Sequence, residues 1–342
     1  MSTWFELKNN YRLKSIYTTR IEIIRSIREF FWLHEFVEVE TPVAVHLASQ
    51  EPYLNPLPIA IHDPSAKEQR FYLRTSPEFS LKKLLAAGYQ KIFEIGKCFR
   101  DYESFGGNHN TEFTMIEWYR APGNYQEIMD DTENLFKFIG KKMNIDELRY
   151  KDRIVSISDD WDRVRMKEIW RQHLGVDLDQ YLEYTALASL AVSKGYTVQE
   201  GDAYEDIFYK IFLNEIEPKL GNKKPIFIYD YPVCMTSLSK LSDDPRYAQR
   251  FELYIGGLEI ANAFGELTDA GVQARNLEAD KNKRKELHKE TWSVDPDFIA
   301  ALESGISSAG GIALGVDRMV LLFTGAKDLN EVIFQSVHDQ LT

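Results

Sequence analysis

Two glutamates flank a glycine pair in a stretch whose other residues are mostly apolar. Glu252 precedes Gly256-Gly257, and Glu259 follows it. A two-residue turn at the glycines would pair Glu252 with Ala261 and would put both carboxylates on one face of a hairpin. Their mutual repulsion predicts a shared cation, and Mg²⁺ held by two carboxylates together with substrate phosphates fits this arrangement. Solvated acids on an exposed hairpin are the alternative.

Glu117 and Tyr119 form a second polar pair inside an apolar segment. Residues 112–120 read as a strand, and the two-residue period of a strand points Glu117 and Tyr119 to the same side. A carboxylate beside a phenol suits an ammonium ligand. Arg100, at the start of the preceding polar loop, has the fork geometry that recognises a carboxylate or a phosphate. The alternative is a structural Arg–Glu pair within a sheet.

Two further segments place polar residues at the starts of predicted helices. Ser76 and Glu78 begin one of them, where an N-cap with a favourable first-turn acid is the alternative to a ligand contact. Arg318 lies in the first turn of another, where the helix dipole disfavours a cation, so an anion or an aromatic plane beside it would explain it. The small residues of 310–315 allow close approach of a ligand or of a neighbouring strand.

The elements that must position these residues indicate an α+β fold, an antiparallel β-sheet flanked by helices. A helix over 19–35, with a capping box formed by Thr19 and Glu22, leads into a strand over 36–40. Neither a dinucleotide-binding glycine motif nor a P-loop is present. Further strand patterns cover 71–74, 91–99, 112–120, 225–229, 251–255 and 258–262, and further helical patterns cover 77–87, 125–141, 204–215, 270–288 and 317–323.

Composition narrows the class of protein. Lys and Arg number 41 against 53 Asp and Glu, so the formal net charge of −12 has the wrong sign for broad contact with nucleic-acid phosphates. No apolar run is long enough for a membrane helix. The two cysteines, Cys98 and Cys234, lack the spacing of metal ligands or of a disulfide framework. The sequence therefore predicts a soluble, cytoplasmic protein without a membrane partner.

In order along the chain, these segments resemble the three signature motifs of class II aminoacyl-tRNA synthetases, most closely those of the lysyl branch. The helix at 19–35, the strand after it and Pro42 resemble motif 1, residues 99–119 resemble motif 2, and residues 311–318 resemble motif 3. The resemblance covers nearly the whole chain. It implies the fold of a class II catalytic domain, which pairs through motif 1, and therefore a homodimer.

Within that branch, the chain resembles the elongation factor P β-lysine ligases. Motif 1 is reached by residue 20, so we expect one catalytic domain over residues 1–342 without an anticodon-binding OB domain. Ala313 stands where lysyl-tRNA synthetases usually carry glycine, and its methyl group would narrow the floor of the amino-acid pocket. The resemblance implies ATP-dependent activation of (R)-β-lysine or lysine as an adenylate, and transfer to a lysine of elongation factor P without tRNA.

The resemblance also implies roles for individual residues. Arg100 would bind the α-phosphate and the substrate carboxylate, and Arg318 would act with it in catalysis. Amino-acid binding would fall to Ser76, Glu78, Glu117, Tyr119, Asn262, Glu266 and Ala313. ATP binding would fall to Arg100, Glu103, Asn110, Phe113, Glu259, Ile260, Gly315 and Arg318, and Mg²⁺ binding to Glu252 and Glu259.

The chain departs from the family pattern in motif 2. Family members typically read Arg-Asn-Glu where this chain has Arg100-Asp101-Tyr102-Glu103, so the acid that contacts adenine is either Glu103 or is lost. Two other functions remain open, a truncated lysyl-tRNA synthetase that charges tRNA and a catalytically silent paralogue that regulates a partner. Intact Arg100, Arg318, Glu252 and Glu259 argue against silence, because a pure binding module does not need the magnesium pair.

Overall fold

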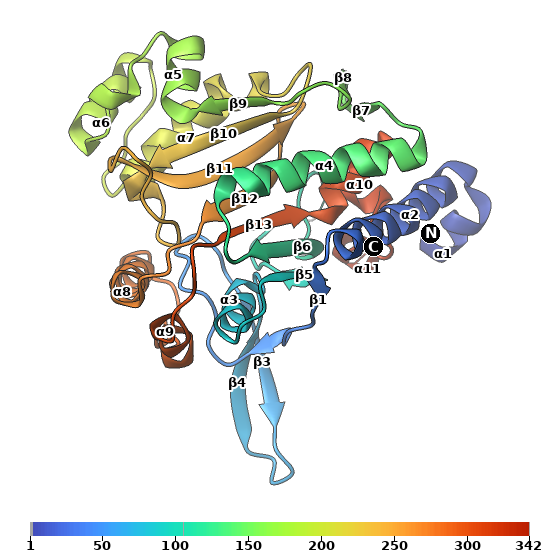
Figure 1. Cartoon of the computed structure of the whole chain (residues 1–342), viewed down its shortest axis with the longest axis horizontal. Coiled ribbons are helices and arrows are strands. Elements are labelled where there is room, and N and C mark those ends of the chain that lie inside the picture. Colours follow the sequence, from blue (N-terminus) through green and yellow to red (C-terminus); the bar gives the residue numbers. More distant parts are fainter. Residues whose placement is uncertain (1–2, 105, 342) are drawn as a thin grey trace.

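A mixed sheet forms the centre of the computed structural model, which describes residues 3–104 and 106–341 (Figure 1). Within these residues the sheet has eight strands, antiparallel through its middle and parallel at both edges, where β1 pairs with β5 and β9 with β10. The predicted α+β fold is confirmed. In spatial order the strands are β1 (Val37–Glu38), β5 (Lys91–Phe99), β6 (Glu112–Arg120), β13 (Gly310–Gly315), β12 (Leu258–Gly265), β11 (Tyr247–Ile255), β10 (Ile226–Pro232) and β9 (Asp162–Arg165).

Three groups of helices surround the sheet. One group packs together on one face of the central strands: α2 (Tyr11–Leu33), α4 (Tyr125–Met143) and α10 (Val316–Thr324). A second group packs around β9–β11: α5 (Met166–Leu174), α6 (Tyr184–Ser193) and α7 (Tyr204–Glu215). A third group lies beside one another below the sheet in Figure 1: α3 (Glu78–Ala86), α8 (Ala270–Glu286) and α9 (Pro296–Glu303).

The remaining elements are short. Strands β2 (Ala44–Val45), β3 (Leu57–His62) and β4 (Glu68–Leu73) form a small sheet whose β3–β4 hairpin projects from the body (Figure 1), and β7 (Glu147–Tyr150) pairs with β8 (Arg153–Ser156). Helices α1 (Thr3–Asn9) and α11 (Val337–Leu341) lie near the two chain ends, and short 3₁₀ turns cover Leu178–Gln180, Glu217–Lys219, Val233–Met235 and Leu329–Glu331. No helix in the described part of the chain is long and apolar enough to cross a membrane.

The first long helix begins earlier than its sequence pattern predicts. Helix α2 starts at Tyr11, after an N-cap at Asn10 whose side chain accepts the Leu13 N–H. The predicted capping box at Thr19 and Glu22 is therefore wrong, because both residues lie inside the helix. The apolar stripe extends upstream through the buried Ile16, which lengthens the packed face. The strand that follows α2 is also shorter than predicted, since pairing with β5 is limited to Val37–Glu38.

A β-bulge changes the register of the hairpin formed by β11 and β12. Gly256 and Gly257 have φ of 62° and 73°, so they form the predicted two-residue turn. The predicted pairing of Glu252 with Ala261 is wrong, because Glu252 pairs with Asn262 and Ile260 has no partner opposite it. The extra residue reverses the alternation along β12. As a result Glu252, Glu259 and Asn262 all lie on one face of the sheet.

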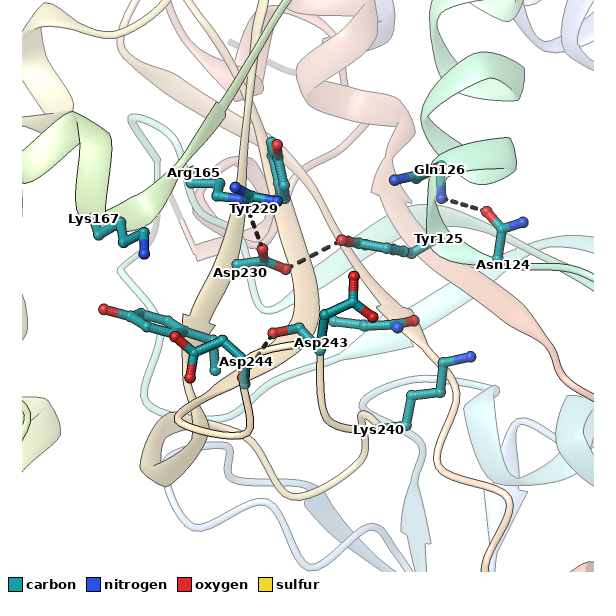
Figure 2. Close-up of a pocket in the computed structure, with 13 residues that line it drawn as sticks. Asn124, Tyr125, Gln126, Arg165, Lys167, Tyr229, Asp230, Lys240, Asp243 and Asp244 are labelled. Carbon is teal, nitrogen blue, oxygen red and sulfur yellow. Dashed lines mark hydrogen bonds and ion pairs between the residues drawn. The ribbon is translucent and has the colours of Figure 1, made fainter. Parts of the chain in front are cut away.

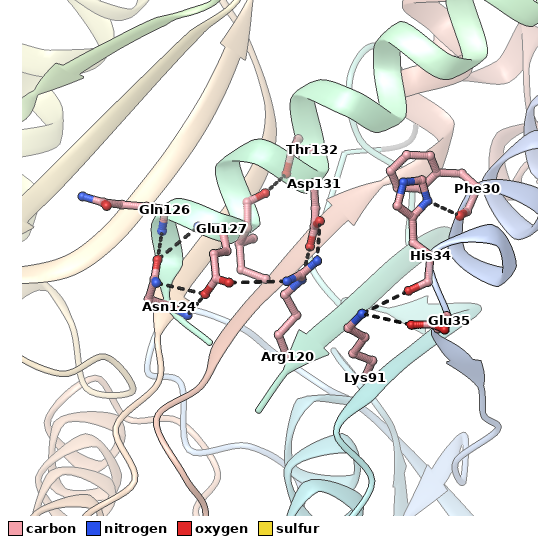
Figure 3. Close-up of polar contacts among 11 residues, drawn as sticks. Phe30, His34, Glu35, Lys91, Arg120, Asn124, Gln126, Glu127, Asp131 and Thr132 are labelled. Carbon is pink, nitrogen blue, oxygen red and sulfur yellow. Dashed lines mark hydrogen bonds and ion pairs between the residues drawn. The ribbon is translucent and has the colours of Figure 1, made fainter. Parts of the chain in front are cut away.

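Side chains of α4 fix the end of β6 (Figure 3). Arg120, the last residue of β6, donates to Asp131 from Nε at 2.7 Å and from Nη2 at 3.1 Å. It also contacts Glu127, which closes a capping box with Asn124 at the start of α4. Since β6 carries Glu117 and Tyr119, these contacts set the position of the strand on which both residues stand.

One buried ion pair joins the three sequence motifs. Arg20 on α2 donates to Asp317 on α10 at 2.5 Å and to the Thr114 hydroxyl on β6 at 2.8 Å. Asp317 in turn accepts the Thr114 N–H at 2.7 Å. The side chains of Arg20 and Asp317 are only 9% and 3% exposed. A helix from each of motifs 1 and 3 is thereby fixed to the strand of motif 2.

Replacing Arg20 with methionine should lower the free energy of unfolding by about 3–5 kcal/mol, because Asp317 would remain buried without its cation. Urea unfolding followed by circular dichroism measures this change. The matched control is Arg12→Met, which breaks the Arg12–Glu331 pair, where Arg12 is 48% exposed. The control should cost no more than about 1 kcal/mol. Equal losses in the two variants would contradict the organising role of Arg20.

Candidate active site

A cavity of about 890 Å³ opens against β6, β11, β12 and β13, with α7 as its far wall. Residues of α7 that line it, such as Glu205, Tyr209 and Lys210, were not identified from the sequence, which predicts that helix but gives no sign that it faces a ligand. The predicted site residues that line the cavity are Arg100, Glu103, Asn110, Phe113, Glu259, Ile260, Asn262, Ala313, Gly315 and Arg318.

Arg100 and Asn110 present unpaired polar atoms in this cavity. The Arg100 guanidinium lies 5.0 Å from the centroid of the Phe113 ring, and its buried Nε has no hydrogen-bond partner among the described residues. Asn110 is 4% exposed; its Nδ2 donates to the Glu112 carbonyl, whereas its Oδ1 also lacks a partner within the described chain. Because buried polar atoms are nearly always hydrogen-bonded, these two atoms indicate a polar ligand.

Arg318 is held in place by main-chain oxygens. Its Nη1 donates to the Glu259 carbonyl at 2.7 Å, and its Nη2 donates to the Asn108 carbonyl at 3.3 Å. The Glu259 carboxylate lies 3.9 Å from Nη1. This carboxylate and the carbonyl oxygens explain why a cation is tolerated in the first turn of α10. The N–H groups of the Arg318 guanidinium that do not take part in these contacts can donate to a ligand in the cavity.

Glu103, the acid that the sequence suggests for adenine contact, is hydrogen-bonded to another residue of the motif 2 loop. The carboxylate of Glu103 lies 2.9 Å from Nδ1 of His109, and both residues line the cavity. This hydrogen bond lowers the pKa of Glu103, so the carboxylate is ionised at neutral pH. Glu103 is therefore present at the cavity wall as a fixed negative group.

The two glutamates of the β11–β12 hairpin differ in their surroundings. The carboxylate of Glu252 is 5% exposed and accepts from Arg250, Tyr231 and Tyr254. The Glu259 side chain is 42% exposed to the cavity. Its pKa is nevertheless raised, first by the enclosing protein and then by the charge of Glu252. A cation between the two carboxylates would relieve that repulsion.

These residues fit Mg²⁺ bound together with phosphates. A carboxylate has about four acceptor positions, of which the hydrogen bonds to Glu252 use three. Glu252, which is buried and does not line the cavity, therefore has one position left, whereas Glu259 lines the cavity and is open. The described residues hold no cluster of three or more His, Cys, Asp or Glu arranged to enclose a metal by themselves. Two carboxylates that leave the other coordination positions to phosphate and water are the common pattern for Mg²⁺.

Behind the cavity, Glu117 is the centre of a buried polar cluster. It is 1% exposed and accepts from the Ser76 hydroxyl at 2.6 Å and from the Tyr119 hydroxyl at 2.9 Å. Burial, followed by the charge of Glu78, raises the pKa of Glu117 to about 8. The predicted neighbours Ser76, Glu78, Tyr119 and Glu266 lie in this cluster and do not line the cavity itself.

Lys82 is the residue of this cluster that the sequence analysis missed. Its Nζ lies 2.6 Å from Glu78 and 2.6 Å from Glu266, and its side chain is 2% exposed. The spacing of four residues from Glu78 within a predicted helix was a usable signal. Burial outweighs the effect of Lys82 on Glu266, whose pKa is raised to about 7.

Strand β13 lies between β6 and β12, and its side chains limit the space for a ligand beside those two strands. Ala313 pairs with Glu117 of β6 on one side and with Asn262 of β12 on the other. Its methyl group therefore shares a face with both side chains and lines the cavity. Gly311 is required for a different reason, since a Cβ there would lie 2.2 Å from the Tyr119 ring and 2.3 Å from the Glu266 carboxylate.

A second cavity, of about 350 Å³, lies on the other face of the sheet (Figure 2). Gln249 lines it and alternates with Arg250, which lines the main cavity. Figure 2 shows Asp230 between Tyr125 and Arg165, at 3.1 Å and 3.2 Å. None of the predicted site residues lines this space. Predicted site residues therefore line the first cavity and, in the case of Ser76 and Glu78, a further cavity of about 320 Å³ beside the start of α3.

Comparison with known proteins agrees with this geometry. Residues 2–336 match the family of tRNA synthetases class II (D, K and N). The chain belongs to this family. It is 35% identical over 329 residues to the elongation factor P–(R)-β-lysine ligase of Baumannia cicadellinicola, which covers 94% of each chain.

Lysine–tRNA ligases are similarly related. Identity is 34% over 336 residues to that of Mycoplasmoides gallisepticum and 36% over 338 residues to that of Magnetococcus marinus. The matched segment covers 97% and 96% of this chain but 66% and 65% of those two ligases. The chain thus spans about two thirds of the length of these relatives.

Glu117 should make the stability of the protein fall with rising pH. Its pKa rises from 4.5 in the unfolded chain to about 8 in the folded protein. Between these values the folded state holds a proton that the unfolded state has lost, so the free energy of unfolding decreases as pH increases. Glu117→Gln should flatten this decline between pH 5 and 8, as measured by urea unfolding.

The matched control is Glu112→Gln on the same strand, where the side chain is 45% exposed and pairs with Lys97. It should leave the pH dependence unchanged. Parallel curves for wild type and Glu117→Gln would show that Glu117 is ionised throughout this range in the folded protein, contrary to expectation.

Proposed function

We propose that this protein activates (R)-β-lysine with ATP and transfers the acyl group to a lysine side chain of translation elongation factor P. The observation that carries the choice of amino acid is the position of Ala313, whose methyl group lies between Glu117 and Asn262. The resemblance associates alanine here with β-lysine ligases. Identity of 35% to a protein of that name supports the acceptor.

In the first proposed step, an oxygen of the substrate carboxylate attacks the α-phosphorus of ATP. The bond from that phosphorus to the bridging oxygen of the β-phosphate breaks, and pyrophosphate leaves with the electron pair. Arg100 supports this step with a buried, unpaired N–H beside the cavity. Arg318 supplies a second guanidinium near the phosphates. Fixed cations at the places where charge develops accelerate such a transfer by positioning and electrostatics.

Mg²⁺, when bound by Glu259 and Glu252, would neutralise phosphate charge and orient the leaving pyrophosphate. This role is supported by the open carboxylate of Glu259 and by the remaining acceptor position of Glu252. The bulge at Ile260 keeps both carboxylates on the same face as Asn262. Asn262 is then available to the substrate carboxylate on the same side.

In the second proposed step, the neutral ε-amine of the acceptor lysine attacks the carbonyl carbon of the adenylate. The bond from that carbon to the phosphate oxygen breaks, AMP leaves, and the amine loses a proton to solvent as the amide forms. The step requires no protein nucleophile. The cavity, bounded by α7 and the motif 2 loop, offers the opening through which the acceptor side chain would enter.

A homodimer through motif 1 is part of this proposal. Trp32, Leu33 and Val37 at the end of α2 and in β1 are 56%, 65% and 48% exposed. Such a group of large apolar side chains on the surface is typical of an interaction site. The family resemblance makes the second copy of the chain its natural partner.

The second candidate is aminoacylation of tRNA with lysine, which the lysine–tRNA ligase relatives favour. The two candidates differ in amino acid and acceptor. Pyrophosphate exchange with (R)-β-lysine and with lysine, followed by transfer to purified elongation factor P or to tRNA, tests both. Exchange with lysine alone together with charging of tRNA would overturn the β-lysine proposal.

Ala313→Gly should shift the amino-acid preference toward lysine. Removing one methyl group from the pocket floor changes discrimination between close analogues by about tenfold or more. The ratio of kcat/KM for (R)-β-lysine over lysine in pyrophosphate exchange measures the shift. Ala309→Gly, at a buried alanine just before β13, is the control and should keep the ratio. An unchanged ratio in Ala313→Gly would remove this residue from the determinants of specificity.

Glu259→Gln should reduce pyrophosphate exchange by at least about 100-fold, because the site loses one of two charges that hold Mg²⁺. The melting temperature should change little, since Glu259 is partly exposed to the cavity. Glu278→Gln, at an exposed position of α8, is the control and should retain full exchange. Full activity of Glu259→Gln would exclude this residue from the metal site.

A further inference from the structure

Lys82 occupies an unusual position for a lysine. It stands on α3 one turn after Glu78, and its side chain is almost completely buried. Its Nζ lies 2.6 Å from Glu78 on the same helix and 2.6 Å from Glu266, which follows β12. No other interaction of the Glu266 oxygens is found within the described residues. Lys82 is thus the group that orients Glu266.

The charges of this cluster do not balance. The carboxyl group of Glu78 lies within electrostatic reach of those of Glu117 and Glu266, so the cluster holds three carboxyl groups. One ammonium group, that of Lys82, lies among them. Burial lowers the pKa of Lys82, but the two carboxylates outweigh it, and the net shift is upward. Lys82 therefore remains charged, and full ionisation of the carboxyls leaves an excess of two negative charges.

The surrounding ionisable groups do not remove this excess. Four of them are paired or neutral: Arg74 pairs with Glu94 at 2.7 Å, Lys83 pairs with Asp295 and Asp297, the pKa of Cys98 is raised to about 12, and the pKa of Tyr119 is raised. Arg100 is a charged group, but it lies at the cavity beside Phe113 and makes no ion pair with these carboxyls. Buried charge without a partner is costly. The cluster consequently favours a ligand with two positive groups.

We propose that Lys82 is a positioning residue that sets the charge of the amino-acid pocket: its ammonium offsets one of the three carboxylates of this cluster, so that the remaining two match the two ammonium groups of a diamino acid. This inference rests on the proposed function, because it takes lysine or (R)-β-lysine as the ligand. Lys82 lies between Glu266 and Glu78, and its charge opposes the rise in the pKa of Glu266. It does not touch the reacting atoms of the substrate.

The proposal gives opposite effects for two variants. The pKa values of Glu117 and Glu266 in the free protein, about 8 and about 7, mean that affinity for a diamino acid rises between pH 6 and 8 as protons leave. Lys82 lowers the pKa of Glu266 more than Glu78 raises it. Lys82→Met therefore moves the rise in affinity to higher pH, whereas Glu78→Gln moves it to lower pH.

Isothermal titration calorimetry with lysine and with (R)-β-lysine from pH 6 to 8.5 measures these shifts. A shift of about one pH unit makes binding by Lys82→Met about tenfold weaker at pH 7. Lys82→Arg, which keeps the charge, should restore the wild-type profile at least in part. The matched control is Lys83→Met on the same helix, whose side chain is 29% exposed and pairs with Asp295; its profile should equal that of wild type.

The outcomes separate this inference from the proposed function. If wild type binds a diamino acid and all variants keep its pH profile, the role of Lys82 is overturned and the proposed function stands. If wild type binds neither diamino acid, both are overturned. If Lys82→Met does not fold, the downward shift of Glu78→Gln decides, since a merely structural cluster would not change the pH profile.

Discussion

The buried ion pair between Arg20 and Asp317 is the constraint on which the rest of the structure depends. The two residues stand almost 300 positions apart, and both also bond to Thr114 on β6. Loss of either residue would leave the other as an uncompensated buried charge. That loss would cost more free energy than the intact pair contributes, so the fold requires both residues. The pair holds two helices against the strand that carries Glu117, and thereby fixes the backbone on which the whole site is built.

The candidate active site also contains buried charged and polar groups, but unlike Arg20 and Asp317 these groups are not matched within the protein. Arg20 and Asp317 are matched, whereas the carboxyls around Lys82 are left in excess, and a donor of Arg100 and an acceptor of Asn110 are left unpaired. A fold gains no stability from such groups. These unmatched groups lie in adjoining parts of one face of the sheet. Their arrangement is the strongest physical sign of a ligand that carries positive, carboxylate and phosphate groups.

Several elements could be predicted from the sequence because local pattern decided them. The limits of β5 and β6 follow from two largely apolar segments separated by a polar loop, and α7 follows from its amphipathic spacing. The start of α2 was missed because Thr19 and Glu22 imitate a cap inside a helix that Asn10 begins. The segment between β8 and α7 had no clear pattern, since its strand β9 is stabilised by pairing with β10 and its helices by a shared apolar core.

The sequence by itself determined which residue types carry charge into apolar strands, and with them the family. Only the tertiary structure decided how those charges meet. The bulge at Ile260 put Asn262 beside Glu252, and the packing of α3 against the end of β12 brought Lys82 to Glu266. Such contacts join residues far apart in the chain, and their geometry depends on register and packing that no local pattern encodes.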